Sequence, residues 1–363
     1  MPNILKRICS HTKAINAVLP TGMALAHSGN PAASLRLERL YGCPVLLSGL
    51  AALVLSCQEL AVLHHHHKTT MQRLQRLHYA TPDCVVYFLG GSLPIMGILH
   101  LRMLNLLAMI ARLGPDNILH KHGRSILLHK GRENAGHSWF IKMRYISTQY
   151  GLPDPILVLQ TPPGLSYWKN LTNLKVLDWW KVHLSGEAEL LASLEFFKPS
   201  FMSLSSPHPI WTTARSPFEV RKAVVTARML SGRYRTDRLS RHWTPSNPSG
   251  LCRLPGCEGC LGDLQHILLH CPALAEARAK AICHWSAFLV PRPWLLPIVS
   301  LHTLQCADNI QLQLLLDPSC LPVVISSNRT NQDILSSCLY LARTWNYTIH
   351  LARERLIKRM NVK

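Results

Sequence analysis

The sequence has 363 residues, 48% of them hydrophobic, and its 39 Lys and Arg residues outnumber its 19 Asp and Glu residues. A chain of this length and composition can bury two or three hydrophobic cores, which excludes an intrinsically disordered protein. The formal net charge of +20 indicates a polyanionic partner, either nucleic acid or an anionic membrane surface.

Twelve cysteines are spread along the chain. The N-terminus lacks the Arg-led apolar stretch and small-residue cleavage site of a secretory signal, so we expect an intracellular protein, in the nucleus or the cytoplasm, with reduced or metal-bound thiols. The most lipid-like segment, 43–57, has about fifteen uncharged residues, fewer than the roughly 20 that a membrane-spanning helix needs. We predict a buried core helix there and no membrane partner.

Helical periodicity dominates the first third of the chain. It predicts helices over 45–63, 71–78 and 95–113, and Gly114-Pro115 ends the last of them. The four consecutive histidines from His64 to His67 could in principle bind a metal ion. Because the run is short, internal and flanked by helix, we predict a polar helix end there instead.

The middle of the chain contains two irregular connections. The first, at 151–164, is rich in Gly and Pro and precedes an amphipathic helix carrying Leu174, Leu177, Trp180 and Leu184. The second is rich in Ser, Pro and His and predicts a domain boundary near residue 207. The expected regions are 1–206, which is helical, 207–285, a basic helix with a metal module, and 286–363, a helical tail.

A basic segment begins the second region. Ser216 and Pro217 are a typical N-cap and first residue for a helix that ends at Leu230. Between Arg215 and Arg241 there are eight Lys or Arg residues and two acids, and guanidinium groups mixed with rings suit phosphate contact and base stacking. A solvated basic face is the alternative. The predicted nucleic-acid contacts are Arg221, Lys222, Arg228, Arg233, Tyr234, Arg235, Arg238, Arg241 and Trp243, with His242 beside them.

A cysteine–histidine motif follows, with the spacing Cys252-x4-Cys257-x8-His266-x4-Cys271. Two close-set ligand pairs can bind one tetrahedral zinc ion with little loss of loop entropy, and Asp263 is placed to cap a short helix before His266. All four positions are filled by protein, so we predict a structural, closed Zn²⁺ site. Cys260 and His270 are spare ligands, since either could replace a member of the set.

The tail has one apolar stripe, formed by residues that alternate at intervals of three and four: Leu335, Cys338, Ala342, Trp345, Ile349, Ala352 and Leu356. This predicts an amphipathic helix of roughly 25 residues. It either docks on the body of the protein or mediates self-association, which leaves the oligomeric state open. The expected fold class is mainly α, with a helical N-terminal region, a small zinc-knuckle module and a long C-terminal amphipathic helix.

Catalytic motifs are missing from the sequence. It contains no phosphate-binding Gly-x4-Gly-Lys-Ser/Thr loop, no Gly-x-Ser-x-Gly nucleophile elbow and no His-Glu-x2-His metal motif. It also has no adjacent Asp-Asp pair, which polymerases use to hold two magnesium ions. We therefore expect a protein that is not an enzyme and has no catalytic residues.

Several segments resemble the region downstream of the polymerase in LINE-type (non-LTR) retrotransposon proteins of animals. These segments are Ala14-Ile-Asn-Ala-Val-Leu-Pro20, Leu40-Tyr-Gly-Cys-Pro-Val-Leu-Leu-Ser-Gly49, Arg112-Leu-Gly-Pro-Asp-Asn-Ile-Leu119, Tyr150-Gly-Leu-Pro-Asp-Pro155, Ala227-Arg-Met-Leu-Ser-Gly-Arg-Tyr-Arg-Thr-Asp-Arg-Leu239 and Leu341-Ala-Arg-Thr-Trp345.

In such proteins a helical thumb-and-linker region and a Cys-Cys-His-Cys knuckle follow the reverse transcriptase. The resemblance implies that the helical region 1–206 is thumb- or linker-like. The resemblance implies that Cys252, Cys257, His266 and Cys271 match the knuckle ligands. It also implies that Arg233, Arg235, Arg238 and Arg241 match the basic approach to the knuckle.

This resemblance implies binding of RNA or DNA without catalysis, because the metal-binding aspartates of the polymerase have no counterpart here. The Met1 start suggests a truncated copy of such a protein. Three alternatives remain: a helical scaffold, a trans-acting subunit for an intact retroelement protein, and a decayed open reading frame with no selected role.

Overall fold

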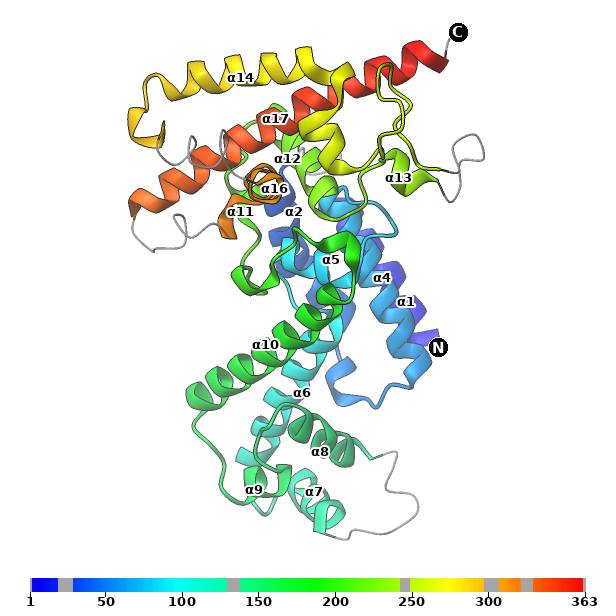
Figure 1. Ribbon diagram of the computed structural model, residues 1–363. Coiled ribbons are helices and arrows are strands. Elements are labelled where there is room, and N and C mark those ends of the chain that lie inside the picture. The colour runs from blue at the N-terminus through cyan, green and yellow to red at the C-terminus, as the bar shows by residue number, and fades with distance from the viewer. Residues whose placement is uncertain are drawn as a thin grey trace.

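A computed structural model describes residues 2–18, 29–128, 138–241, 249–296, 307–320 and 329–361. These residues are predominantly helical and contain no β-strand (Figure 1). The mainly α fold class predicted from the sequence is therefore confirmed.

The longer helices of the first half are α1 (Pro2–Val18), α2 (Pro31–Leu37), α3 (Cys43–Leu47), α4 (Cys57–Gln75), α5 (Asp83–Gly90), α6 (Ile95–Arg112), α7 (Ile118–Leu128), α8 (Trp139–Gln149), α9 (Pro155–Gln160) and α10 (Leu165–Glu189). The second half contains α11 (Pro209–Thr212), α12 (Pro217–Leu230), α13 (Asp237–Ser240), α14 (Ala275–Leu289), α16 (Asp308–Leu316) and α17 (Arg329–Asn361).

The N-terminal part is organised around α6, which packs against α9 and α10 (Figure 1). Trp168 of α10 donates its indole N–H to the backbone oxygen of Leu104 on α6, at 3.0 Å. Trp180 lies over Gly97, where a β-carbon would come within 2.6 Å of the indole nitrogen. Among the described residues α6 is the one helix long and apolar enough to cross a membrane, and 56% of it is buried inside the protein. Its packing makes it a core helix.

The predicted stripe on α10 is only partly correct. Leu184 is buried, but Leu174 is 60% exposed. The buried face instead runs through Trp168, Thr172 and Val176 at intervals of four residues. Trp168 is bonded to α6, and side chains four residues apart lie on the same face of a helix.

The helix predicted over 45–63 is interrupted, and so is the core helix predicted over 43–57. α3 ends at Leu47, and α4 begins after Ser56, whose side chain accepts a hydrogen bond from the backbone N–H of Glu59 while the Glu59 carboxylate accepts one from the Ser56 N–H. This capping box outweighs the continuous apolar pattern, because it satisfies backbone donors that would otherwise be unpaired.

The histidine run does not form a helix end, because α4 continues from Cys57 to Gln75 and places the run in its interior. His67 is fully buried, and its Nε2 lies 3.7 Å from Oε1 of Glu38, which is also buried. His11 of α1 approaches the same carboxylate oxygen at 3.7 Å. The run therefore contributes to the contact between α1 and α4.

Acid is expected to destabilise the protein through its buried histidines. Burial lowers the pKa of His67 and of His100 to about 4, although Glu38 opposes the shift at His67. An unfolded histidine titrates near pH 6.5, so between about pH 6.5 and pH 4 the unfolded chain binds more protons. Above pH 6.5 these histidines should therefore not lower the free energy of unfolding. As the pH drops towards 4, the free energy of unfolding should fall by up to about 3 kcal/mol for each of them.

Urea unfolding at several pH values tests this expectation. His67→Gln should flatten the acid-side loss of stability, whereas His65→Gln at an exposed position of the same run should behave like the original chain. Equal pH profiles for the two variants would contradict the assignment to His67.

The C-terminal part is built on α17, against which α12, α14 and α16 pack (Figure 1). The indole N–H of Trp345 donates to the backbone oxygen of Leu268 at 3.3 Å, and that of Trp285 donates to Leu341 at 3.0 Å. The predicted stripe is buried at Cys338, Ala342, Trp345 and Ile349. The tail helix is longer than expected, at 33 residues, and docks on the body as predicted. The centre of the stripe is therefore not exposed for self-association.

Contacts cross the domain boundary predicted near residue 207. The backbone N–H of His208 donates to Leu89 at 3.0 Å, and the Asn30 side-chain amide donates to the backbone oxygen of Ala214 at 2.8 Å. The second predicted boundary, after residue 285, lies within α14. The second and third predicted regions therefore share α14, and the structure does not separate the cysteine–histidine motif from the tail at residue 285.

Candidate metal centre

A short hairpin holds the first two predicted ligands. The backbone N–H of Cys252 donates to Cys260 at 2.8 Å, and that of Gly262 donates to Gly250 at 3.0 Å. Gly262 sits against α13, where a β-carbon would come within 2.6 Å of the Asp237 β-carbon. A side chain at this position would therefore push the hairpin away from α13.

The second pair lies on the turn that follows. Asp263 Oδ1 accepts a hydrogen bond from the backbone N–H of His266 at 2.9 Å, as predicted for a cap. A π-helical turn, η6 (His266–His270), returns the chain so that the Cys271 N–H donates to the His266 oxygen at 2.6 Å. Arg278 of α14 then donates to the Cys271 oxygen at 2.8 Å. These bonds orient His266 and Cys271 towards the hairpin.

The four predicted ligands converge. The ligand atoms of Cys252, Cys257, His266 and Cys271 all lie within 4.8 Å of one another, and all four residues are buried. The Sγ atoms of Cys257 and Cys271 are 3.4 Å apart. Nε2 of His266 is buried and has no hydrogen-bond partner among the described residues. Three sulfurs and an unpartnered imidazole nitrogen in this arrangement could hold one metal ion.

The spare ligands are placed elsewhere. Cys260 is exposed and does not belong to the cluster. His270 is exposed, and its Nε2 lies 2.6 Å from Oδ2 of Asp308 on α16. The alternatives that the sequence left open are therefore not used in this arrangement.

Crowding of the thiols shifts their pKa values in opposite directions. A hydrogen bond from the Cys271 thiol lowers the pKa of Cys252 to about 5, and the same contact raises the pKa of Cys271. Burial raises the pKa of Cys257. Thiolates this close to one another repel, so all three sulfurs can ionise together only if a cation lies between them.

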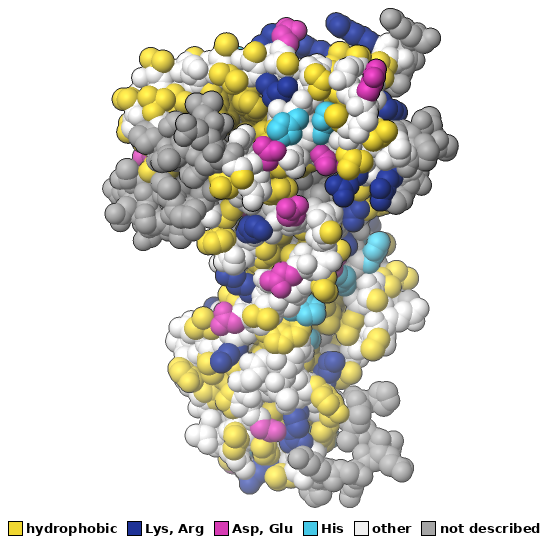
Figure 2. Space-filling model, in the orientation of Figure 1, with side chains coloured by type: hydrophobic (Ala, Val, Ile, Leu, Met, Phe, Trp, Pro, Cys, Tyr) yellow, Lys and Arg dark blue, Asp and Glu magenta, His cyan; other side chains and the backbone are white. Residues whose placement is uncertain are grey.

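The basic residues near the cluster form an exposed surface around α13, where Figure 2 shows Lys and Arg side chains gathered. We call Arg235, Arg238 and Arg241, which are all exposed, the α13 basic surface. Nη1 of Arg238 lies 3.5 Å from Oδ2 of Asp263, the residue that caps the metal-binding turn. The predicted cations Arg221 and Arg228 are also exposed, on α12, and Arg228 Nε donates to the backbone oxygen of Arg76.

Other predicted contacts are not surface groups. Lys222 is buried, and its Nζ donates to Thr344 Oγ1 at 3.0 Å. Tyr234 is also buried, with its hydroxyl 3.0 Å from His350 Nδ1. Both side chains are bonded to α17 and are therefore not exposed as the predicted nucleic-acid contacts would need to be. Arg233 is half-buried, whereas His242 and Trp243 lie outside the described residues.

A buried ion pair beneath this surface was missed by the sequence analysis. Asp237 of α13 is 2% exposed and contacts Arg253 Nε at 2.8 Å and Arg353 Nη2 at 3.5 Å. Arg353, on α17, also donates to the backbone oxygen of Arg235 at 2.8 Å. Nothing in the local sequence indicates this pairing, because Arg353 is far along the chain. The pair joins α13, α17 and the hairpin that holds Cys252 and Cys257.

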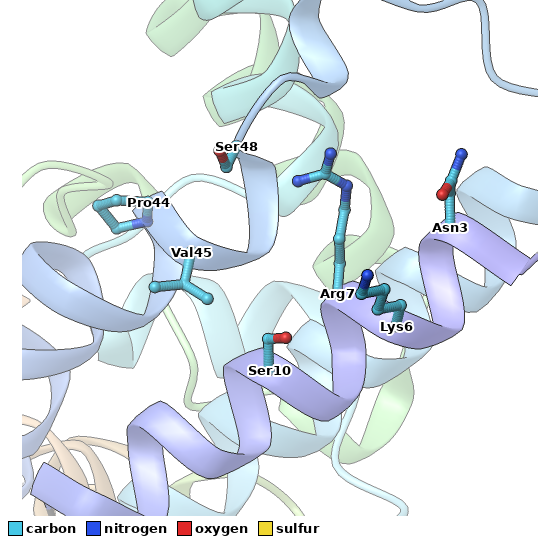
Figure 3. A pocket seen from close by; sticks show the side chains of 7 residues that line it. All are labelled: Asn3, Lys6, Arg7, Ser10, Pro44, Val45 and Ser48. Atoms are coloured by element: carbon cyan, nitrogen blue, oxygen red, sulfur yellow. The ribbon is translucent and has the colours of Figure 1, made fainter.

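Cavities that the described residues form outside the cluster include two of several hundred cubic ångström. One, of about 540 Å³, separates α1 from α3 and is lined by two cations and no carboxylate (Figure 3): Asn3, Lys6, Arg7, Ser10, Pro44, Val45 and Ser48. The other, of about 690 Å³, lies beside the α13 basic surface and includes Arg238 and Arg241 in its wall. Only the second cavity shares residues with the predicted site.

The comparisons with known proteins do not add to this geometry. No protein-family model, curated protein or solved structure matches the chain.

Proposed function

We propose that the protein is a non-catalytic nucleic-acid-binding protein in which a structural zinc ion organises an adjacent basic surface. One observation carries the proposal. Asp263 caps the turn that holds His266 through one carboxylate oxygen and contacts Arg238 through the other. The fold of the ligand loop and the position of a surface cation are therefore coupled.

The donor set supports zinc as the metal. Three sulfurs and one imidazole are borderline-soft ligands, which suit Zn²⁺ and do not suit Mg²⁺ or Ca²⁺. Zinc–sulfur bonds of about 2.3 Å in a tetrahedron separate neighbouring sulfurs by about 3.8 Å. The clustered ligand atoms need only small movements to reach that geometry. With four protein ligands the ion has no open position for a catalytic water.

An origin in a LINE-type retroelement accounts for the combination of this knuckle with a helical body. The quoted sequence segments support that origin, and the mainly α fold is compatible with it. RNA, DNA and an intact retroelement protein are then the proposed partners, in the nucleus or cytoplasm. The scaffold alternative has less support, since the centre of the tail stripe is buried against the body.

Salt-dependent binding of labelled single-stranded RNA and DNA tests the proposal. Replacing Arg235, Arg238 and Arg241 together by Ala should weaken binding to all sequences, because phosphate contacts carry no base information. The slope of log affinity against log salt should fall by about one for each arginine lost. Fluorescence anisotropy between low and physiological salt measures both effects.

A matched variant removes the same charge elsewhere. Arg355, Lys358 and Arg359 are exposed near the end of α17, so their replacement by Ala controls for net charge. The metal content of each variant should be measured in parallel, since Arg238 contacts Asp263. Equal affinity loss in the two triple variants would contradict a specific α13 basic surface, and no loss in either would favour the scaffold.

A further inference from the structure

The cavity beside the α13 basic surface is formed by four separate segments of the chain. They are the turn η4 (Ala192–Leu194) with the residues that follow it, the segment from the end of α12 through α13, the cap of the metal-binding turn, and α16. Its volume is about 690 Å³, which is within the range of small-molecule sites. Because these segments meet only in the folded chain, the cavity depends on the tertiary structure.

Part of the lining is apolar. Phe196, Met229, Leu230, Leu264 and Leu316 contribute to it. Two aromatic residues, the partly buried Phe196 and the buried Tyr234, belong to the lining. An apolar, partly aromatic wall of this kind suits a flat heterocycle better than it suits a phosphate or a sugar.

Polar groups at the opening have both signs of charge. Arg238 and Arg241 are exposed members of the lining, and Glu195 and Asp263 stand among them. Guanidinium groups bind phosphate oxygens, whereas carboxylates and the side chains of Gln265 and Asn309 can hydrogen-bond the edge of a base. Cations at the mouth and an apolar wall inside match the two halves of a nucleotide.

We infer that this cavity receives an unpaired nucleobase of a bound single strand, while the flanking phosphates lie on Arg238 and Arg241. The inference rests on the proposed function and specifies its ligand class. A base in a duplex is stacked and paired, so the cavity selects single strands over duplexes of equal charge. The group that the cavity recognises is the base, which RNA and DNA both contain.

The metal module contributes one wall of this site, while the four predicted metal ligands themselves lie outside its lining. Asp263, Leu264 and Gln265 line the cavity and directly precede the ligand His266. Loss of the ion should therefore remove base binding together with the local fold. The zinc ion acts here as a positioning element, consistent with its closed coordination.

The test compares two probes with equal numbers of phosphates on the full-length, metal-loaded protein. One is oligothymidylate of about twelve nucleotides, within the site sizes common for single strands, and the other is an abasic strand of the same length. The original chain should bind the first about tenfold more tightly than the second. An oligouridylate arm measures whether the 2′-hydroxyl changes this ratio.

Ala192→Trp fills the cavity from an exposed position in its wall and should bring the ratio close to one while leaving the salt dependence intact. Ala279→Trp, at an exposed position of α14 outside the cavity, should keep the original ratio. Asn309→Trp fills the cavity from α16 and provides a second variant if Ala192→Trp does not fold.

The possible outcomes separate the two proposals. Equal binding of both probes by the original chain, with normal salt dependence, would overturn the base cavity and leave the proposed function standing. A base-dependent ratio that survives both cavity-filling variants would place base contact elsewhere and also overturn the inference. Absence of salt-dependent binding to either probe would refute the proposed function itself.

Discussion

Replacing Cys271 by Ser is expected to abolish metal binding and to unfold the segment from Gly250 to Leu274. Cys271 is fully buried at the centre of the cluster, and its Sγ lies 3.4 Å from that of Cys257. Structural zinc sites contribute roughly 10 kcal/mol or more of apparent free energy in small metal domains, and binding and folding of the ligands are one event. The metal content should fall from about one ion per chain to none, and hydrogen exchange should show that the amides of this segment lose their protection.

The chain provides a control for this prediction. Cys260→Ser removes a nearby thiol that is exposed and outside the cluster, so metal content and protection should stay unchanged. A chelator added to the original protein should reproduce the effect of Cys271→Ser. If the Cys260 variant lost the ion and the Cys271 variant kept it, the ligand assignment would be wrong.

Replacing Arg353 by Met should produce a second large effect, on global stability. Arg353 and Asp237 are each 2% exposed, and removal of the guanidinium leaves a buried carboxylate with Arg253 as its remaining cation. Breaking a buried pair from one side costs about 3–5 kcal/mol, since the other charge stays desolvated and poorly compensated. Guanidinium chloride unfolding, monitored by circular dichroism, measures the change.

Two further variants separate the ion pair from general helix effects. Arg355→Met removes a cation from an exposed position of the same helix and should cost much less. Combining Arg353→Met with Asp237→Asn should recover part of the stability, because the unpaired charge is removed. Equal destabilisation by Arg353→Met and Arg355→Met would show that the pair has no special role.

The sequence predicted the features that depend on neighbouring residues. Four ligands within twenty residues, separated by short turns, can meet without help from distant segments, and the structure brings them together as the spacing indicated. Ser216 and Pro217 start α12 where predicted, because the capping box joins Ser216 to Glu219 within the first turn. The long tail helix follows from its three-and-four periodicity.

The sequence did not predict which side chains would be buried by distant partners. Lys222 and Tyr234 belong to a basic segment, yet both are buried against α17, more than a hundred residues further along the chain. The run ending at His67 was assigned to a polar helix end, but α1 and Glu38 enclose it. A local pattern of residue types predicts which face of a helix a side chain lies on. It does not predict which distant element packs against that face.

The sequence by itself determined the candidate metal ligands, the helical class and the tail helix, because each arises from short-range spacing, capping or periodicity, and the tertiary structure then excluded the spare ligands Cys260 and His270. Only the tertiary structure showed that Asp237 pairs with Arg353, which of the predicted arginines are exposed, and that a cavity lies beside the exposed ones. Each of those features requires segments that are far apart in the chain to meet at one place. Which segments meet is set by the packing of the whole hydrophobic core, which no local window of sequence contains.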